Sequence, residues 1–280
     1  MPEGDTIHRA ARTLHMALAG CTITRFETAL PALARIDFDT PLRGRAVQSV
    51  ESRGKWCLMR FSGDLVLVTH MRMHGSWHLY RPGAPWRQAR PDMRVLIATP
   101  DYEAVAFNVP VAEFHTERSL GRHPVLKALG PDLIASQFDQ GAAVQKLRAS
   151  AAPDIASALL DQRVMAGVGN VFKSEILFLC AINPFAAVSS LTGAQLERLV
   201  TTARKLVALN ARLPTQPHDA FYPGSRRTTG MMSPRARLWV YDRAGKPCRR
   251  CGTPIRVVRQ GLDARGTYWC PSCQPLAICD

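Results

Sequence analysis

The sequence lacks any segment suited to export or to crossing a membrane. It opens with no basic stretch followed by an apolar run of signal-peptide length, and its longest apolar stretches, near Val66 and Ile176, are too short to span a bilayer. Long polar tracts are missing as well, and 46% of the 280 residues are hydrophobic, which excludes wholesale disorder and a collagen-like fibre. We expect a folded cytoplasmic protein without a membrane partner, and the length favours two domains.

Acidic residues are scarce, and lysine is scarcer. There are 22 Asp and Glu against 36 Lys and Arg, a formal net charge of +14, and 30 of the 36 bases are arginine. A guanidinium grips phosphate bidentately and stacks on bases, so a polyanionic partner is indicated. The bases are concentrated late in the chain, because residues 226–280 hold 11 bases and 3 acids. No acidic cluster has the spacing of an open two-metal site, which argues against a metal-dependent nuclease.

Four of the eight cysteines form two CxxC pairs. Cys248 and Cys251 make the first pair, Cys270 and Cys273 make the second, and 18 residues separate the pairs. Each pair lets two thiolates converge on one ion, so the spacing predicts one structural zinc ion, worth on the order of 10 kcal/mol, rather than four unpaired thiols. The other cysteines are expected to be small buried hydrophobes or free surface thiols: Cys21, Cys57, Cys180 and Cys279.

The first part of the chain changes from a helical to a strand pattern. Apolar residues recur at helical spacing over residues 7–18, with Asp5 or Thr6 as the expected N-cap and Gly20 as the stop. Over residues 23–114, short segments rich in Val, Ile, Phe and Trp are separated by Gly, Pro and Asp. This pattern favours a β-sandwich or barrel. We predict an α+β protein whose first domain, residues 1–120, is a β-sandwich with a flanking helix.

The rest of the chain is divided by composition into three parts. Residues 121–150 carry His-Pro and Gly-Pro pairs and are expected to connect the domains. Residues 151–234 are expected to form a helical domain followed by a long mobile loop, and residues 235–280 two hairpins held by the four cysteines as a zinc finger. The predicted helices cover 154–162, 171–180 and 192–210, the last opened by a capping box of Thr192 and Gln195.

Two features of the chain suit phosphate binding. Gly167 and Gly169 precede Asn170, the expected N-cap of the helix over 171–180. Free backbone N–H groups at this helix start can bind a phosphate, although an ordinary N-cap after a glycine turn explains the same residues. Arginines are interleaved with aromatic residues between the cysteine pairs, like a phosphate clamp or else a solvated basic hairpin. These residues are Arg256, Arg259, Arg265, Tyr268 and Trp269.

The first residues suggest covalent chemistry on a sugar. If the initiator methionine is removed, as a small second residue permits, Pro2 exposes a secondary amine of which a useful fraction is neutral. This amine can attack an aldehyde-like sugar carbon to give an iminium, which acts as an electron sink. Glu3 is then placed to donate a proton to the sugar ring oxygen. Proline at position 2 is also commonplace, so an ordinary terminus is the alternative.

Four motifs occur in order along the chain. They are MPEGDT at the start, RGKW at residues 53–56, AGVGNVFKSEIL at residues 166–177, and CRRCGTPI followed by ARGTYWCPSCQ in the tail. Together they resemble the formamidopyrimidine-DNA glycosylase / endonuclease VIII family, from Pro2 to Gln274. The resemblance implies an N-terminal β-sandwich with flanking helices, a helix-two-turn-helix domain and a C-terminal zinc finger, with damaged DNA bound in the cleft between.

The resemblance also implies catalytic roles, residue by residue. It makes Pro2 the nucleophile that forms a Schiff base and Glu3 the general acid. Lys55 takes the place of a hairpin lysine that assists β-elimination and contacts the damaged nucleotide, with a solvated strand lysine as the alternative. Arg265 takes the place of a finger-tip arginine that grips phosphate and serves the δ-elimination step.

Further residues are implied to bind DNA. Asn170 would be the phosphate ligand of the helical motif. Glu175 matches an acidic residue near the nucleophile, or else it is a helix-surface charge. Lys127 stands beside Ala128, where endonuclease VIII has a DNA-contacting arginine, so that phosphate contact is in question.

A wedge into the DNA is implied at residues 72–74. Arg72, Met73 and His74 would enter the space left by an everted base, with Met73 as the first choice unless it is a core methionine. This tripeptide differs from the familiar versions of the family. The preference for the opposite base therefore does not transfer.

Two segments resemble the endonuclease VIII branch more closely. Residues 3–6 lack the Leu-Pro-Glu of the 8-oxoguanine branch, and residues 239–243 read Trp-Val-Tyr-Asp-Arg. The implied function is a bifunctional DNA glycosylase and AP lyase of base excision repair that removes oxidised bases, pyrimidines above all, and cuts the strand by β- and δ-elimination. We expect a nucleoid-associated monomer without a redox or nucleotide cofactor. The alternatives are a non-catalytic zinc-ribbon DNA-binding protein and an 8-oxoguanine-directed family member.

Overall fold

The computed structural model describes residues 2–212, 226–231, 233–261 and 264–276. They form two compact units, the first mainly from residues 2–128 and the second from residues 129–210 with the chain after residue 225. The mobile loop predicted over 211–234 lies largely outside the described residues. Within the described part of the chain, no helix combines the length and the apolar character needed to cross a membrane.

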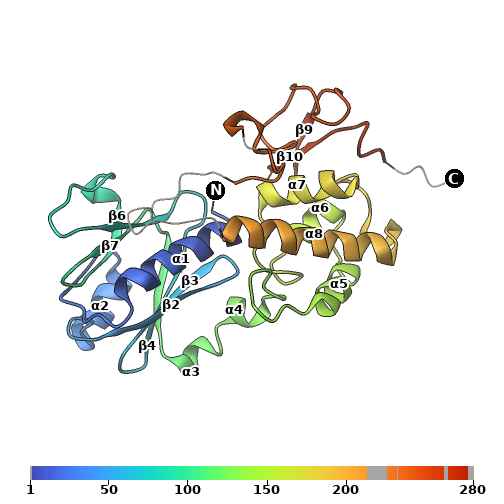
Figure 1. The fold of residues 1–280 in the computed structure, drawn as a ribbon. Coiled ribbons are helices and arrows are strands. Elements are labelled where there is room, and N and C mark those ends of the chain that lie inside the picture. Colours follow the sequence, from blue (N-terminus) through green and yellow to red (C-terminus); the bar gives the residue numbers. More distant parts are fainter. Residues whose placement is uncertain (1, 213–225, 232, 262–263, 277–280) are drawn as a thin grey trace. The chain divides into compact units, whose positions relative to one another are not determined.

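The first unit is a sandwich of two antiparallel four-stranded sheets, with helix α1 (Gly4–Leu18) packed against strand β2 (Figure 1). One sheet has the strand order β2-β3-β4-β8 and the other β1-β6-β7-β5. Side chains of α1 and of both sheets form one buried core around Leu14, Leu67, Trp77 and Ile97. The predicted β-sandwich with a flanking helix is confirmed. The strands are β1 (Arg25–Thr28), β2 (Val47–Arg53), β3 (Trp56–Phe61), β4 (Leu65–His70), β5 (Ser76–Tyr80), β6 (Met93–Ala98), β7 (Glu103–Phe107) and β8 (Val111–His115).

Helix α1 begins closer to the N-terminus than predicted. Its N-cap is Glu3, whose backbone oxygen accepts the amides of Thr6 and Ile7 at 2.9 and 3.1 Å. Asp5 and Thr6, the predicted caps, are buried inside the first turn, so that prediction is wrong. Asp5 is a favourable cap by local preference. Burial of the whole first turn overrides this preference.

Helix α2 (Pro31–Asp39) lies where the sequence predicts only strands. Proline in its first turn suits a helix start, but Leu33 is its one buried residue. A single buried position produces no helical period, so the pattern contains no signal for this helix. Two short helices follow strand β8, namely α3 (Glu117–Leu120) and α4 (Pro124–Ala128).

The second unit is mainly helical. The predicted capping box is present, since the Thr192 hydroxyl accepts the Gln195 amide at 3.2 Å and the Gln195 side chain accepts the Thr192 amide at 2.8 Å. Helix α5 lies within residues 121–150, and its Ala143 and Leu147 belong to the helical core, so this stretch is more than a connection. The domain boundaries drawn from the sequence stay a prediction. The helices are α5 (Gln140–Arg148), α6 (Ile155–Leu160), α7 (Asn170–Cys180) and α8 (Gly193–Ala211), and single 3-10 turns occur at Arg90–Asp92 in the first unit and at Val188–Ser190 and Pro234–Ala236 in the second.

Over its described residues up to Leu276, the finger of the second unit has one regular hairpin instead of the two predicted. Strands β9 (Arg256–Gln260) and β10 (Arg265–Trp269) pair antiparallel, whereas the first cysteine pair lies in a turn closed by a bridge between Pro247 and Pro254. Proline has no amide proton to donate, so a ladder does not extend through this bridge. The buried core of the finger consists of Phe178 from α7 with Val240, Cys248, Ile255 and Cys270.

A buried histidine ties strand β5 to the loop that follows it. His78 is 1% exposed, with Nε2 2.8 Å from the Ser76 hydroxyl and Nδ1 2.9 Å from the Tyr80 hydroxyl, which also accepts the Arg87 amide. Burial, aided by the charge of Arg87, lowers the pKa of His78 to about 4. The folded chain therefore keeps this ring neutral at pH values where the unfolded chain protonates it.

We expect the free energy of unfolding to rise with pH between about 4 and about 6.5. In this window the unfolded chain binds a proton at His78 that the folded chain does not, which is worth up to about 1.4 kcal/mol per pH unit. Above about pH 6.5 neither the folded nor the unfolded chain protonates His78, so this residue causes no further change in the free energy of unfolding. Urea unfolding of the wild type and His78→Gln across this range measures the slope. An equally steep slope in the variant would contradict a neutral His78.

Candidate functional site

The hairpin between β2 and β3 carries Lys55. Arg53 pairs with Trp56, so Gly54 and Lys55 form a two-residue turn in which Gly54 has a φ of +58°. Glycine adopts this left-handed conformation without a steric cost. Lys55 is half-buried, and Trp56 pairs in register with His70, the last residue of β4. The Lys55 turn therefore lies beside the loop that follows β4.

The loop after β4, residues 71–75, exposes the three residues predicted to enter DNA. Arg72, Met73 and His74 are all exposed, Met73 to 51%, so the alternative of a core methionine is wrong. The Gly75 amide closes the loop by donating to the Met71 oxygen at 2.8 Å. A Cβ atom at Gly75 would stand only 2.5 Å from the same oxygen. This 71–75 loop therefore requires glycine at its end.

His70 supports the 71–75 loop from within the strand. Its Nδ1 accepts the Arg72 amide at 3.1 Å, and Arg72 takes a φ of +50°, a left-handed conformation uncommon for arginine. Burial and the positive charges of Arg72 and Lys55 lower the pKa of His70 to about 4. A neutral ring keeps its Nδ1 lone pair available for that amide at physiological pH.

The two residues predicted to react with a sugar lie at the start of α1. Pro2 is half-buried, and Glu3 is fully buried. Asp5 and Thr6 in the same turn are buried too. This burial differs from the solvent-exposed chain end that an ordinary terminus would give.

Helix α7 holds Asn170 against the finger. Gly169 is the N-cap and Asn170 is the first helical residue, so the prediction of Asn170 as the cap is wrong. The Asn170 Nδ2 donates to the backbone oxygen of Gly266 in β10 at 2.9 Å. Its Oδ1 is buried and has no hydrogen-bond partner among the described residues. Arg265, half-buried at the start of β10, directly precedes the residue that Asn170 contacts.

Glu175 makes contacts that neither sequence interpretation anticipated. Its carboxylate is fully buried and accepts the amides of Trp239, Val240 and Tyr241 at 2.8, 2.9 and 2.9 Å, together with the Thr228 hydroxyl. Burial raises the pKa of Glu175, and these four donors oppose that shift. The helix-surface alternative is therefore wrong. The carboxylate accepts hydrogen bonds from the chain leading into the finger.

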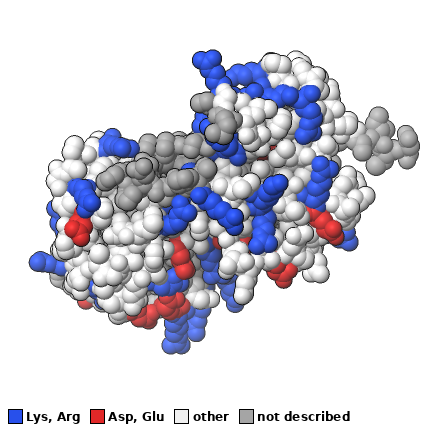
Figure 2. Space-filling view, viewed as in Figure 1, with Lys and Arg blue, Asp and Glu red and all other residues white. Residues whose placement is uncertain are grey.

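Part of the tail's positive charge serves the finger itself. Arg243 and Arg249 donate to backbone oxygens of the tail at 2.7 and 3.0 Å, and Arg250 lies over the Phe178 ring at 4.6 Å. Figure 2 shows Lys and Arg side chains gathered over the region where Figure 1 draws β9 and β10. The exposed bases of strand β9 are Arg256 and Arg259.

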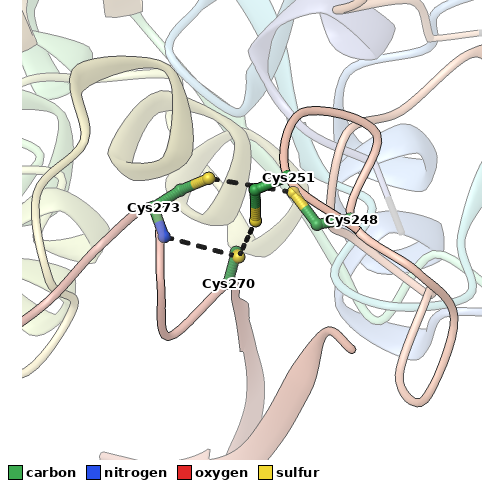
Figure 3. Close-up of side chains that lie close together, drawn as sticks. All are labelled: Cys248, Cys251, Cys270 and Cys273. Carbon is green, nitrogen blue, oxygen red and sulfur yellow. Dashed lines mark hydrogen bonds between the residues drawn. The ribbon is translucent and has the colours of Figure 1, made fainter. Parts of the chain in front are cut away.

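The four predicted zinc ligands converge on one point (Figure 3). Their Sγ atoms all lie within 4.8 Å of one another, with Cys248 3.9 Å from Cys273 and Cys251 3.4 Å from Cys270. Sulfurs at about 2.3 Å from a tetrahedral zinc ion stand about 3.8 Å apart, so the cluster has the size of a zinc site. The amides of Arg250 and Cys273 donate to Sγ atoms within the two turns. The finger holds one structural zinc ion.

Two of the cysteines outside the zinc cluster are buried. Cys57 and Cys180 are buried free thiols, as predicted. Burial raises the pKa of Cys57 to about 12 and also raises the pKa of Cys180, so both stay protonated. Cys21 is a half-buried free thiol. Cys279 lies outside the described residues.

A second group of ligand-type residues, Glu113, His115 and His123, lacks the chemistry of a metal site. Their ligand atoms lie within 4.8 Å of one another. However, His123 Nδ1 accepts the Leu126 amide at 3.2 Å, so the neutral ring carries its proton on Nε2, the nitrogen that faces Glu113 at 3.6 Å. A metal-binding histidine has the reverse arrangement, because its second nitrogen donates.

The predicted site residues fall into groups within each unit. In the first unit Lys55 adjoins the 71–75 loop, and in the second Asn170 adjoins the start of β10 at Arg265. Lys127 is exposed in the last turn of α4 and belongs to neither group.

Sequence reasoning missed two supporting residues. His70 has no signal of its own, because its role depends on the fold bringing Nδ1 to the Arg72 amide. Lys173 does have a signal, since it interrupts an otherwise largely apolar run in α7. It is 1% exposed, and its Nζ donates to the Thr267 hydroxyl of β10 at 2.7 Å.

Three family models match successive parts of the chain. The formamidopyrimidine-DNA glycosylase N-terminal domain matches residues 1–121, the formamidopyrimidine-DNA glycosylase H2TH domain residues 129–213, and the zinc finger found in FPG and IleRS residues 245–276. The chain is also 41% identical to the probable endonuclease 8 2 of Streptomyces coelicolor, over 98% of this chain and 94% of that protein. The chain belongs to the formamidopyrimidine-DNA glycosylase and endonuclease VIII family. The resemblance inferred from the four motifs is confirmed.

Other members of the family support the same assignment. The DNA-(apurinic or apyrimidinic site) lyase Nei2 of Mycolicibacterium smegmatis is 38% identical over 98% of this chain and 99% of its own length. The structure of Lactococcus lactis Fpg in complex with DNA containing an abasic site has a TM-score of 0.82 and 25% identity, covering 98% of this chain and all of that one. The predicted β-sandwich, helix-two-turn-helix domain and zinc finger of the family are confirmed.

Removal of zinc is expected to unfold the finger and leave the first unit folded. The finger core consists of few apolar side chains, two of them zinc ligands, and so depends on the ion. Elemental analysis should find one zinc per chain in the wild type and in Cys180→Ser, and less in Cys270→Ser. Chelation should abolish the near-ultraviolet signal of the finger tryptophans. A finger that keeps this signal without zinc would contradict a structural ion.

Glu175→Gln is expected to destabilise the second unit by about 1–3 kcal/mol, because the amide turns one acceptor into a donor facing backbone N–H groups. Urea unfolding measures the change, and hydrogen exchange should accelerate at residues 239–241. Glu197→Gln, an exposed change on α8, is the matched control and should leave both unaltered. Equal stability of the two variants would show that the four contacts do not hold the finger.

Proposed function

We propose that this chain is a bifunctional DNA glycosylase and AP lyase of base excision repair. The observation that carries the proposal is the identity of 38% over nearly the whole length to a relative named DNA-(apurinic or apyrimidinic site) lyase. The zinc finger, the exposed 71–75 loop and the net charge of +14 suit a protein that grips DNA. We further propose that it acts as a monomer on nucleoid DNA.

Pro2 is the proposed nucleophile for base removal. Once the preceding methionine is removed, the Pro2 nitrogen attacks C1′ of the damaged nucleoside, and the base leaves with the electrons of the glycosidic bond and takes up the proton that the Pro2 nitrogen releases. Glu3 protonates O4′ as the C1′–O4′ bond breaks, so the sugar ring opens and an iminium joins Pro2 to C1′. The enclosure of both residues at the start of α1 supports these roles.

The iminium then drives strand cleavage as an electron sink. Loss of a C2′ proton expels the 3′-phosphate, and a second elimination expels the 5′-phosphate. Lys55 assists the first step from its hairpin turn, and Arg265 grips phosphate with Asn170 and serves the second. Water hydrolyses the remaining iminium and returns the Pro2 amine. The half-buried Lys55 and the contact of Asn170 with β10 support this division of roles.

The 71–75 loop is proposed to stabilise the everted nucleotide. Extrusion of a base costs a few kcal/mol of stacking, and an inserted side chain offsets part of this cost. Met73, with Arg72 and His74 beside it, is exposed on a loop held at both ends by hydrogen bonds. Lys127 would add a phosphate contact in the absence of an arginine at Ala128.

Oxidised pyrimidines are the proposed substrates. The relative at 41% identity is named as an endonuclease 8, and residues 239–243 resemble that branch. Members directed at 8-oxoguanine belong to the same family, so a lesion panel has to separate the two specificities. A non-catalytic zinc-ribbon protein would bind the same DNA without forming a covalent complex.

Borohydride trapping tests the chemistry and the substrate together. The wild type should form covalent complexes with oligonucleotides containing thymine glycol, dihydrouracil or an abasic site, and less with 8-oxoguanine. Pro2→Gly should trap at least tenfold more slowly, because a primary amine forms an imine that needs an added proton to become cationic. Mass spectrometry of the trapped peptide should place the adduct on Pro2. An adduct elsewhere, or full activity with the methionine retained, would refute the nucleophile.

Glu3→Gln separates the two activities. It should lose most base removal and keep trapping on a preformed abasic site, since that site needs no departing base. Glu197→Gln is the matched control and should resemble the wild type.

A further inference from the structure

A fully buried ammonium group lies on α7, outside the catalytic roles proposed above. Lys173 is 1% exposed, and its Nζ donates to the Thr267 hydroxyl, which is fully buried, at 2.7 Å. Burying a lysine charge is costly unless it is well compensated, and methionine fills a similar volume without that cost. A charged residue at this position therefore suggests a task that packing alone does not fulfil.

Residues of α7 contact successive residues of β10, in the same order along both elements. Asn170 contacts the Gly266 oxygen at 2.9 Å, Lys173 contacts Thr267, and the Ser174 hydroxyl accepts the Tyr268 amide in a long contact of 3.5 Å. Four residues of a helix rise about 6 Å, and two residues of a strand extend about 6.6 Å. The helix and the strand therefore run parallel here, with closely matching spacing.

This ladder fixes where Arg265 points. Side chains two residues apart in a strand lie on the same face, so the Arg265 side chain shares its face with Thr267, which contacts α7. Continuing the ladder one step beyond Gly266 brings Arg265 to the N-terminal end of α7, beside Asn170. A slip of one residue would move Arg265 by about 3.3 Å and turn it to the opposite face.

We propose that Lys173 is a positioning residue that, through Thr267, sets the register of β10 on α7 so that Arg265 and Asn170 reach the same DNA phosphate. The bond to the hydroxyl selects this register, because the neighbouring β10 side chains, Gly266 and Tyr268, offer Lys173 no equivalent acceptor at that position. The roles of Arg265 and Asn170 rest on the proposed function above. The placement of Lys173 rests on the contacts alone.

The test uses a pair of matched substitutions in full-length, zinc-loaded protein. Thr267→Val keeps the shape and removes the hydroxyl, whereas Thr267→Ser keeps the hydroxyl. We expect Thr267→Val and Lys173→Met each to weaken binding to abasic-site DNA about tenfold and to lower the ratio of δ- to β-elimination product at least fivefold. The slope of log affinity against log salt should flatten by about 0.9, the value for one lost phosphate contact. Thr267→Ser should stay within twofold of the wild type.

Further arms separate a positioning role from general damage. The double variant Lys173→Met/Thr267→Val should be no worse than either single variant in these readouts, since each single variant already breaks the bond between Lys173 and Thr267. Lys205→Met, an exposed change on α8, should leave the product ratio unaltered, and all variants should keep one zinc per chain. Borohydride trapping at saturating enzyme should be unchanged, because it reports on Pro2.

Different results would overturn the proposed lyase function and the positioning role of Lys173. A wild type that binds abasic DNA but traps nothing would overturn the proposed lyase function, and the binding and salt-slope arms would still test Lys173. Variants Lys173→Met and Thr267→Val with wild-type affinity, salt slope and product ratio would overturn the positioning role. Additive losses in the double variant would overturn it too, since they would mean that the two residues act independently.

Discussion

The second unit depends on the buried polar groups of one helix. Asn170, Lys173 and Glu175 all lie on α7 with almost no exposure, and each would be costly to bury without a partner. The finger and the chain leading into it supply those partners through Gly266, Thr267 and the amides of residues 239–241. The dependence is mutual, because the finger has too small an apolar core to fold alone. Helix and finger therefore form one body.

A second set of contacts closes this body at the other end of α7. The Gln274 side chain accepts the Cys270 amide at 3.0 Å and donates to the Ile182 oxygen at 2.7 Å, while Asn183 donates to the Gln274 oxygen at 2.8 Å. The second cysteine turn is thus tied to the residues just after the helix. Zinc holds the two cysteine turns together, and the hydrogen bonds of Gln274 fix the second turn to the end of α7. Asn170 and Arg265, the residues proposed to bind phosphate, are positioned by the zinc turns and by these bonds together.

Features that depend on residues close together in the sequence could be predicted, whereas features that depend on distant residues could not. The CxxC spacing and the capping box at Thr192 depend on local chemistry, and both were predicted correctly because short spacing dictates geometry. The cap at Glu3 was missed because burial of the first turn of α1 overrode local preference, and helix α2 was missed because its single buried residue leaves no helical period. Glu175 was predicted to be an acid near the nucleophile or a charge on the helix surface. Its four hydrogen-bond donors lie more than fifty residues away in the chain, so nothing beside it in the sequence reveals them. Hydrogen bonds between buried groups that are far apart in the chain leave no repeating pattern in the sequence.

The net charge of this chain overstates the number of basic side chains that are available to contact DNA. Composition located an excess of bases after residue 225, which suits a polyanionic partner, but several of these arginines contact the protein itself. They cover the rings of Phe172 and Phe178 or donate to backbone oxygens within the tail: Arg226, Arg227, Arg243, Arg249 and Arg250. A small finger has few apolar residues, and the flat guanidinium both shields aromatic rings and satisfies carbonyls that no ladder reaches. Arginine therefore dominates over lysine for two reasons at once, and only the fraction that points outward can release counterions from DNA.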